Sequence, residues 1–227
     1  KEVTLYTFKE LVDLEKVGTL KRACENARQW LQEVATDHDW WDGVYETWTS
    51  ALNQIGFTDA DISFSGFCSQ GDGASFTCKS VDMDLLIDFL LSDIEPTSVI
   101  SYDGKTEDFR GWLLHKTGGK PNANPEFSKL TGKVVGEVTR ISHHYAHYNT
   151  CDFGLEEDDS EFFESTENTK LANDLGKLCE DLREDICHAI YKDLEEEYEW
   201  RTDDEQLIED AMANEWLFNE YGEMESV

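Results

Sequence analysis

Residues Asp61 to Cys78 read Asp-Ile-Ser-Phe-Ser-Gly-Phe-Cys-Ser-Gln-Gly-Asp-Gly-Ala-Ser-Phe-Thr-Cys. Apolar and small polar residues alternate over 61–67 and again over 74–78, which is typical of strands because successive side chains point to opposite faces. The glycine-rich break between them predicts a hairpin turn. With a four-residue loop, we expect Phe67 to lie opposite Phe76 as an aromatic cross-strand pair.

Helical patterns lie on both sides of this hairpin. Apolar residues recur at helical spacing over 9–34, 39–55, 81–92 and 168–199, with Gly18 as a break in the first range. Thr202-Asp-Asp-Glu205 matches a capping box, which predicts that a shorter final helix begins there.

A second hairpin is expected between Lys133 and Thr150, because this range is rich in β-branched and aromatic residues. Together these patterns predict an α+β fold. Its parts are N-terminal helices, a small antiparallel sheet built from the two hairpins, and a helical C-terminal region packed on that sheet.

The composition narrows the classes of function. The 227 residues include 50 Asp and Glu against 19 Lys and Arg, a formal net charge of −31. Such a charge repels DNA, RNA and anionic membranes, so direct binding to any of them is excluded. Hydrophobic residues make up 39%, with seven Trp and only three Pro, so the chain is not disordered or fibrous. A basic protein, a cation or a neutral ligand remains as a partner.

The acidic residues are concentrated towards the C-terminus. Residues 155–227 contain 26 Asp and Glu and 5 Lys and Arg, which is two thirds of the net charge. We therefore predict an α+β body over 1–154 and an acidic helical region over 155–227, with a single domain as the alternative. The run Glu156-Glu-Asp-Asp-Ser-Glu161 is interpreted as an exposed linker between them.

The segment Lys1-Glu2-Val3-Thr4-Leu5 lacks the apolar core of a signal peptide. The longest apolar stretch, Leu85–Leu91, is interrupted by Asp88 and is far shorter than the ~20 residues of a membrane span. We expect a soluble cytoplasmic protein. The six cysteines show no C-x-x-C spacing, so reduced and mostly buried thiols are expected.

One candidate small-ligand site combines a turn with a histidine cluster. The turn holds Ser69, Gln70 and Asp72 among glycines that expose backbone N–H groups, and the cluster holds His143, His144 and His147. On a strand, the first and last of these histidines would share a face. A hydrolase that uses Cys68 or Ser69 beside a histidine is an alternative, and so is a purely structural hairpin turn. The turn lacks the lysine of a phosphate-binding P-loop. No H-E-x-x-H motif occurs among the histidines, so no metal site is predicted.

The acidic C-terminal region is the leading candidate, because rigid helices with many carboxylates can approximate the charge of duplex DNA, about one per 1.7 Å. Solubility alone is the alternative interpretation. The predicted partner-binding residues are the carboxylates of the two densest runs: Glu156, Glu157, Asp158, Asp159, Glu161, Asp193, Glu195, Glu196, Glu197, Glu199, Asp203, Asp204, Glu205, Glu209 and Asp210.

The segment Phe64-Ser-Gly-Phe-Cys-Ser-Gln-Gly-Asp-Gly-Ala-Ser-Phe76 resembles one that is common in bacteriophage accessory proteins. Leu194–Glu205 and Asn214–Asn219 are similar to the end of those proteins, and the likeness covers about residues 40–80 and 175–220. The resemblance implies a phage origin and expression inside a bacterial cell. It supplies no catalytic residues. By charge, the chain is similar to phage proteins that mimic DNA and block restriction or CRISPR defence.

These observations predict a non-enzymatic inhibitor without a cofactor. It would bind the basic nucleic-acid-binding surface of a bacterial defence protein through its carboxylates. The alternative is a protein that binds or hydrolyses a small ligand or nucleotide signal through the turn and the histidines. The oligomeric state stays open, with a dimer as one alternative.

Overall fold

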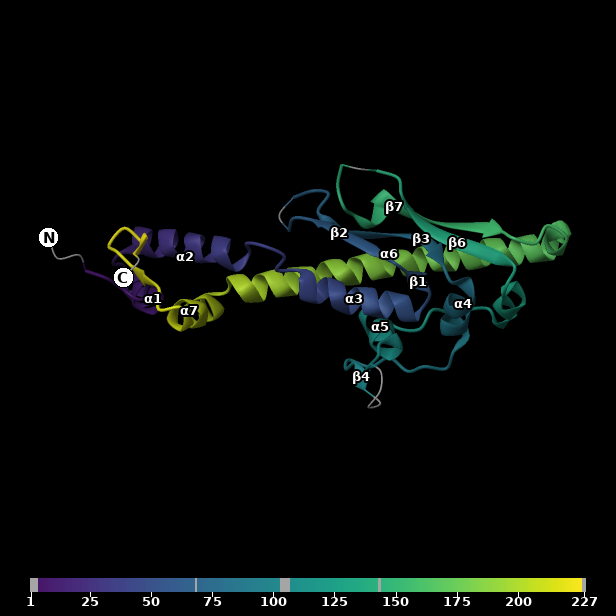
Figure 1. Ribbon diagram of the computed structural model, residues 1–227, viewed down its shortest axis with the longest axis horizontal. Helices are drawn as coiled ribbons and strands as arrows, with labels where there is room; N and C mark the ends of the chain where they lie inside the picture. Colours follow the sequence, from purple (N-terminus) through teal and green to yellow (C-terminus); the bar gives the residue numbers. More distant parts are fainter. Residues whose placement is uncertain (1–3, 68, 103–106, 143, 226–227) are drawn as a thin grey trace. The chain divides into compact units, whose positions relative to one another are not determined.

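The computed structural model describes residues 4–67, 69–102, 107–142 and 144–225, and it confirms the α+β fold with a small antiparallel sheet (Figure 1). The chain forms two units. The first joins Lys1–Asp42 to Leu194–Val227, and the second is Gly43–Asp193. This division differs from the boundary predicted at residue 155, because the first and last segments of the chain pair with each other. The backbone N–H groups of Tyr6 and Phe218 each donate to the carbonyl of the other residue at 2.8 Å.

The first unit is mainly helical. It contains α1 (Phe8–Lys16), α2 (Lys21–Ala35), the last turns of α6 (Thr166–Thr202), α7 (Asp204–Ala213) and the two-stranded pair β8 (Leu217–Phe218) and β9 (Met224–Glu225). Apolar faces of α1, α2 and α7 form its core around Leu11, Ala27, Leu207 and Phe218. Burial of these amphipathic faces, rather than helix propensity, stabilises such short helices.

The start of α7 differs from the sequence prediction. Thr202, expected as the N-cap, is the last residue of α6. Asp203 is the N-cap instead, and its carboxylate accepts a hydrogen bond from the Glu205 N–H at 2.9 Å. A single residue thus separates the two helices.

The second unit is built on the sheet. Its strands are β1 (Phe57–Thr58), β2 (Asp61–Ser65), β3 (Gly73–Val81), β6 (Val134–Arg140) and β7 (Cys151–Glu157), all paired antiparallel. The order is β1-β3-β6-β7, and β2 pairs with β3 as well. The other elements are α3 (Asp42–Gln54), α4 (Met83–Leu91), the pair β4 (Ser101–Tyr102) and β5 (Glu107–Asp108), α5 (Arg110–Lys116), and the 3-10 helices η1 (Pro125–Leu130), η2 (Tyr148–Thr150) and η3 (Phe162–Glu164). The helix predicted from residue 39 begins at Asp42, because His38 and Asp39 take positive φ values of 50° and 35°.

The first hairpin is confirmed, but its predicted register is wrong. Ile62, not Phe67, lies opposite Phe76, and Ser65 lies opposite Gly73. The connection is longer than expected because Gly66 leaves the strand with a φ of 41°, and the Asp72 carboxylate accepts the Ser69 N–H at 2.5 Å. Phe67 stacks instead on Phe64 and on Tyr191 of α6, with ring centroids 5.6 Å apart in each pair.

The second hairpin is also present, with its return strand later than predicted. The strand β6 pairs with β7, so the end of the predicted hairpin range, up to Thr150, lies in the connection between the two strands, which includes η2. Glu156 and Glu157 pair with Val135 and Val134. The run 156–161 is therefore not simply a linker, because it begins inside β7.

The helix α6 runs along the sheet (Figure 1). The contact is made by specific bonds as well as apolar burial: the backbone N–H of Phe153 on β7 donates to Glu180 Oε2 at 2.8 Å. Leu175, Cys179, Ile186 and Ile190 of α6 are fully buried, as the predicted apolar stripe requires. Among the helices in the described part of the chain, none has both the length and the apolar character of a membrane span.

Candidate partner-binding surface

The carboxylates between α6 and α7 gather around a cleft of about 490 Å³. It is lined by Glu196, Glu199, Trp200, Asp203, Glu205, Gln206 and Glu209. The one-residue connection between the helices is responsible, because it places the last turns of α6 beside the first two turns of α7. Helical spacing also contributes, because residues three or four apart lie on the same side of a helix. Glu196 and Glu199 are three residues apart, and Glu205 and Glu209 are four apart.

Helix dipoles act differently on the two walls of the acidic cleft. Asp203 and Glu205 lie at the N-terminus of α7, where free amides and the dipole stabilise carboxylates. Glu199 lies in the last turn of α6, where the dipole is unfavourable to a negative charge. A bound cation would relieve that repulsion. We therefore expect a basic partner to gain more binding energy at the α6 wall than at the α7 wall.

Trp200 is an aromatic side chain within the acidic cleft. It is 54% exposed. The guanidinium carbon of Arg201 lies 5.9 Å from the centre of its ring. An exposed indole among carboxylates is suited to Lys or Arg, which it attracts through the cation–π interaction in addition to ion pairing.

Several of the predicted binding carboxylates stabilise the fold instead. Asp193 is only 13% exposed, and it accepts from Lys116 Nζ at 2.5 Å and from Trp48 Nε1 at 3.0 Å. Asp204 is held by Arg28 at 2.7 and 3.0 Å. The remaining pairs are Glu197 with Arg201, Asp159 with Lys133, and Asp210 with the Gln206 amide.

The predicted surface is divided between the two units. The acidic run over 195–210 belongs to the first unit, and the run over 156–161, with Asp193, belongs to the second. In the second unit, Glu156, Glu157 and Asp158 are exposed where β7 ends. The first unit has the denser charge, with 22 Asp and Glu against 7 Lys and Arg in 76 residues, compared with 28 against 12 in 151.

The alternative ligand site is partly assembled. The loop after β2 lies against the 144–147 segment, because the Ser65 hydroxyl donates to the Ala146 carbonyl at 3.0 Å and accepts its N–H at 3.3 Å. A Cβ at Gly71 would contact Tyr145, and one at Gly73 would clash with His147. The turn therefore lies beside Tyr145 and His147. A position of Cys68 or Ser69 beside His143 or His144 stays a hypothesis.

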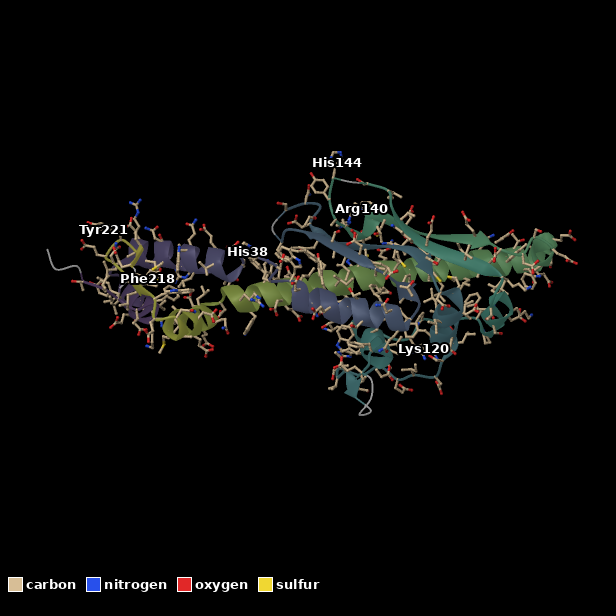
Figure 2. The ribbon with its side chains drawn as sticks, in the orientation of Figure 1. His38, Lys120, Arg140, His144, Phe218 and Tyr221 are labelled. Atoms are coloured by element: carbon tan, nitrogen blue, oxygen red, sulfur yellow. The ribbon has the colours of Figure 1, made fainter. Side chains whose placement is uncertain are left out.

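His144 and His147 do not lie on a strand, contrary to the prediction. His147 precedes η2, and its Nδ1 lies 2.6 Å from Asn149 Oδ1. His144 is exposed at the outer end of its loop (Figure 2). His143 and Cys68 lie outside the described residues. In the part of the chain that the structure describes, no three His, Cys, Asp or Glu side chains are grouped as metal ligands.

A buried thiol and guanidinium cluster was not predicted. Arg183 on α6 is 2% exposed, and its Nη1 lies 3.3 Å from Cys151 Sγ and 3.7 Å from Cys187 Sγ. Its charge is balanced by Glu180, which its Nε contacts at 2.8 Å. The signal in the sequence is that Arg183 lies four residues from both Cys179 and Cys187, on the apolar side of the helix.

This environment separates the pKa values of the two thiols. The hydrogen bond from Cys187, assisted by the charge of Arg183, lowers the pKa of Cys151 to about 7. The same hydrogen bond and burial raise the pKa of Cys187 well above its usual value. The pair therefore begins to share one thiolate near neutral pH, while its second thiol stays protonated. The other described cysteines, Cys24, Cys78 and Cys179, are free and buried, and burial raises the pKa of each.

Comparison with known families matches residues 40–204 to DUF8835, a domain of unknown function. This match covers most of the chain, so the protein belongs to that family. It includes the whole second unit and all of α6 but leaves out α1, α2 and nearly all of α7. No curated protein matches the chain, and no solved structure matches it.

Proposed function

We propose that the chain is a non-enzymatic acidic protein that binds the basic nucleic-acid-binding surface of another protein. The observation that carries this proposal is the acidic cleft, which brings five carboxylates and the exposed Trp200 together. From Asp203 to Glu225 the chain contains nine carboxylates and no Lys, Arg or His. A surface of this kind attracts cationic protein surfaces over a distance and competes with nucleic acid for them.

The partner class follows from the charge and from the resemblance to bacteriophage accessory proteins. We propose that the protein acts in the cytoplasm of a bacterial host on a restriction or CRISPR defence protein. The basic groove that this target uses for nucleic acid is the surface complementary to the acidic cleft. Steric occupation of the groove is enough for inhibition, so no catalytic residue is required.

Capture from bacterial lysate tests the proposal. The immobilised chain should retain a basic nucleic-acid-binding protein at low salt and release it when duplex DNA or about 0.5 M salt is added, because screening shortens the range of charge attraction. A variant with Glu199→Lys, Glu205→Lys and Glu209→Lys should retain none. A matched control carries Glu156→Lys, Glu157→Lys and Asp158→Lys, which changes the net charge equally on the other unit. If the control variant fails to retain the basic protein and the cleft variant still retains it, the binding surface is not this cleft.

A small-ligand function is the second candidate, favoured by the hydrogen bonds between Ser65 at the end of β2 and Ala146, and by the proximity of Gly73 to His147. It predicts that cyclic or linear nucleotides bind the purified chain and that His144→Ala weakens this binding. Calorimetric titration of the purified chain with a panel of nucleotides tests whether any of them binds. Absence of heat for the whole panel would remove nucleotides as ligands.

A further inference from the structure

Residues of α7 also line a second depression, an apolar groove. It has a volume of about 370 Å³ and is lined by Thr7, Phe8, Ala211, Met212, Glu215, Trp216 and Leu217. The helix α7 contributes to both depressions. Glu205, Glu209 and Met212 are spaced i, i+4, i+7, so they follow one side of α7 from the cleft to the groove.

The groove has a rigid floor and one adaptable wall. Phe8 and Ala211 are buried, and Trp216 packs edge-on against Trp30 with ring centroids 5.1 Å apart. Met212 is 61% exposed. An exposed, unbranched thioether over a fixed apolar floor can adjust to different apolar side chains.

The negative charge around the apolar groove determines which charge a ligand of the groove can carry. Glu215 lines the groove, Glu10 lies two residues after Phe8, and the next lining carboxylates are those of the acidic cleft. An apolar ligand with negative charge is therefore repelled. A ligand with apolar side chains beside several positive ones satisfies both depressions at once.

We propose that α7 binds a Lys- and Arg-rich amphipathic helix, whose apolar side chain enters the groove while its basic side chains lie in the acidic cleft. The proposal rests on the proposed function, because the cleft is the same. Glu205 and Met212 are seven residues apart, which is about 10 Å along a helix. A helix bound along α7 presents an apolar and a basic residue at the same separation, two turns apart on one face.

A peptide experiment tests this with the full chain. The probe is a labelled Leu/Lys amphipathic peptide of about 18 residues, five helical turns. Its reference is a peptide of the same composition with the order scrambled, so that charge is equal and the apolar face is lost. We expect the amphipathic peptide to bind at least about tenfold more tightly than the scrambled one, which corresponds to burial of one large apolar side chain.

Two variants test whether the preference for the amphipathic peptide arises in the groove. Met212→Gln should remove most of the tenfold preference and leave binding of the scrambled peptide unchanged. Val17→Gln is the matched control, because Val17 is 74% exposed in the same unit but outside the groove. In a methyl NMR spectrum of the three methionines, Met212 should shift on binding and buried Met83 should not.

Two outcomes separate failure of this inference from failure of the proposed function. Equal affinities for the two peptides, with binding lost in the Glu199→Lys, Glu205→Lys, Glu209→Lys variant, would overturn the groove and leave the acidic cleft standing. Absence of salt-dependent binding for both peptides would overturn the cleft and the groove together.

Discussion

Arg28 holds Asp204 at two points, Nε to Oδ1 at 2.7 Å and Nη2 to Oδ2 at 3.0 Å. The same Nη2 contacts Glu15 Oε2 at 2.7 Å. One base thus ties α1, α2 and α7 together and supplies the counter-charge that two carboxylates of a strongly acidic unit share. Removal of this base leaves both acids partly buried without a counter-charge.

Arg28→Met should therefore lower the free energy of unfolding by about 1–3 kcal/mol in urea denaturation. The ion pair lowers the pKa of Glu15. Its contribution is present above the pKa of unfolded glutamate, near 4.3, and is lost as the pH falls through the lower folded value. The control Lys9→Met breaks an exposed pair with Asp13 and should leave the free energy of unfolding nearly unchanged. Equal effects of the two variants would contradict the structural role of Arg28.

Asp193 and Glu199 should give opposite results. Asp193→Asn leaves Lys116 without its counter-charge at a mostly buried site, so we expect a loss of about 1–3 kcal/mol in stability and unchanged binding of basic peptides. Glu199→Gln should weaken peptide binding and leave stability within about 0.5 kcal/mol. Calorimetric titration and urea denaturation of both variants check this. The assignment fails if Asp193→Asn impairs binding in a chain that remains folded.

Two glycines with similar backbone angles should differ in their tolerance of alanine. Gly18 and Gly222 have φ values of 84° and 79°. A Cβ at Gly18 meets open space, but one at Gly222 would lie 2.1 Å from the Ala23 carbonyl oxygen. Gly18→Ala should cost about 1–2 kcal/mol for the left-handed backbone alone. Gly222→Ala should cost distinctly more, because the C-terminal segment must move away from α2. Similar melting temperatures for the two variants would contradict this packing.

The Cys151 thiol should ionise near pH 7, which an absorbance titration at the thiolate band can follow, with Cys151→Ser as the reference. Because the folded pKa lies below the unfolded value near 8.5, the stabilisation is fully present above the unfolded value. It disappears as the pH falls through about 7. The stability difference between the native chain and Cys151→Ser should therefore shrink from pH 9 to pH 6. A midpoint near 9 would show that Arg183 and Cys187 do not act on this thiol.

Periodicity was enough to predict α1 to α4, α6, α7 and the presence of both hairpins, because apolar spacing directly reflects burial on one face, but it did not predict the short helix α5. It could not predict the register of β2 on β3, since that depends on the seven-residue connection and on the hydrogen bond that the Ser69 N–H donates to the Asp72 carboxylate. The return strand at 151–157 was missed because Glu156 and Glu157 alternate poorly with apolar residues on an edge strand.

The candidate surface was predicted only as a set of charges. The sequence locates the acidic runs, but it does not show which of their carboxylates form ion pairs within the fold. Asp193 and Asp204 are bound by Lys116 and Arg28, which lie 77 and 176 residues away in the chain. Such long-range pairs, and the cleft formed by the bend at Asp203, follow from tertiary packing. The buried cluster around Arg183 was missed for the same reason.

Competition with DNA shows whether the acidic cleft occupies the nucleic-acid-binding surface of its partner. The partner retained in the capture experiment is bound to a fluorescent duplex, and the chain is added while anisotropy is followed. We predict that the chain displaces the duplex and that the Glu199→Lys, Glu205→Lys, Glu209→Lys variant requires at least about 100-fold more protein, since like charges across an interface cost several kcal/mol. A chain that binds this partner while the duplex stays bound would contradict the proposal that its acidic cleft occupies the nucleic-acid-binding surface.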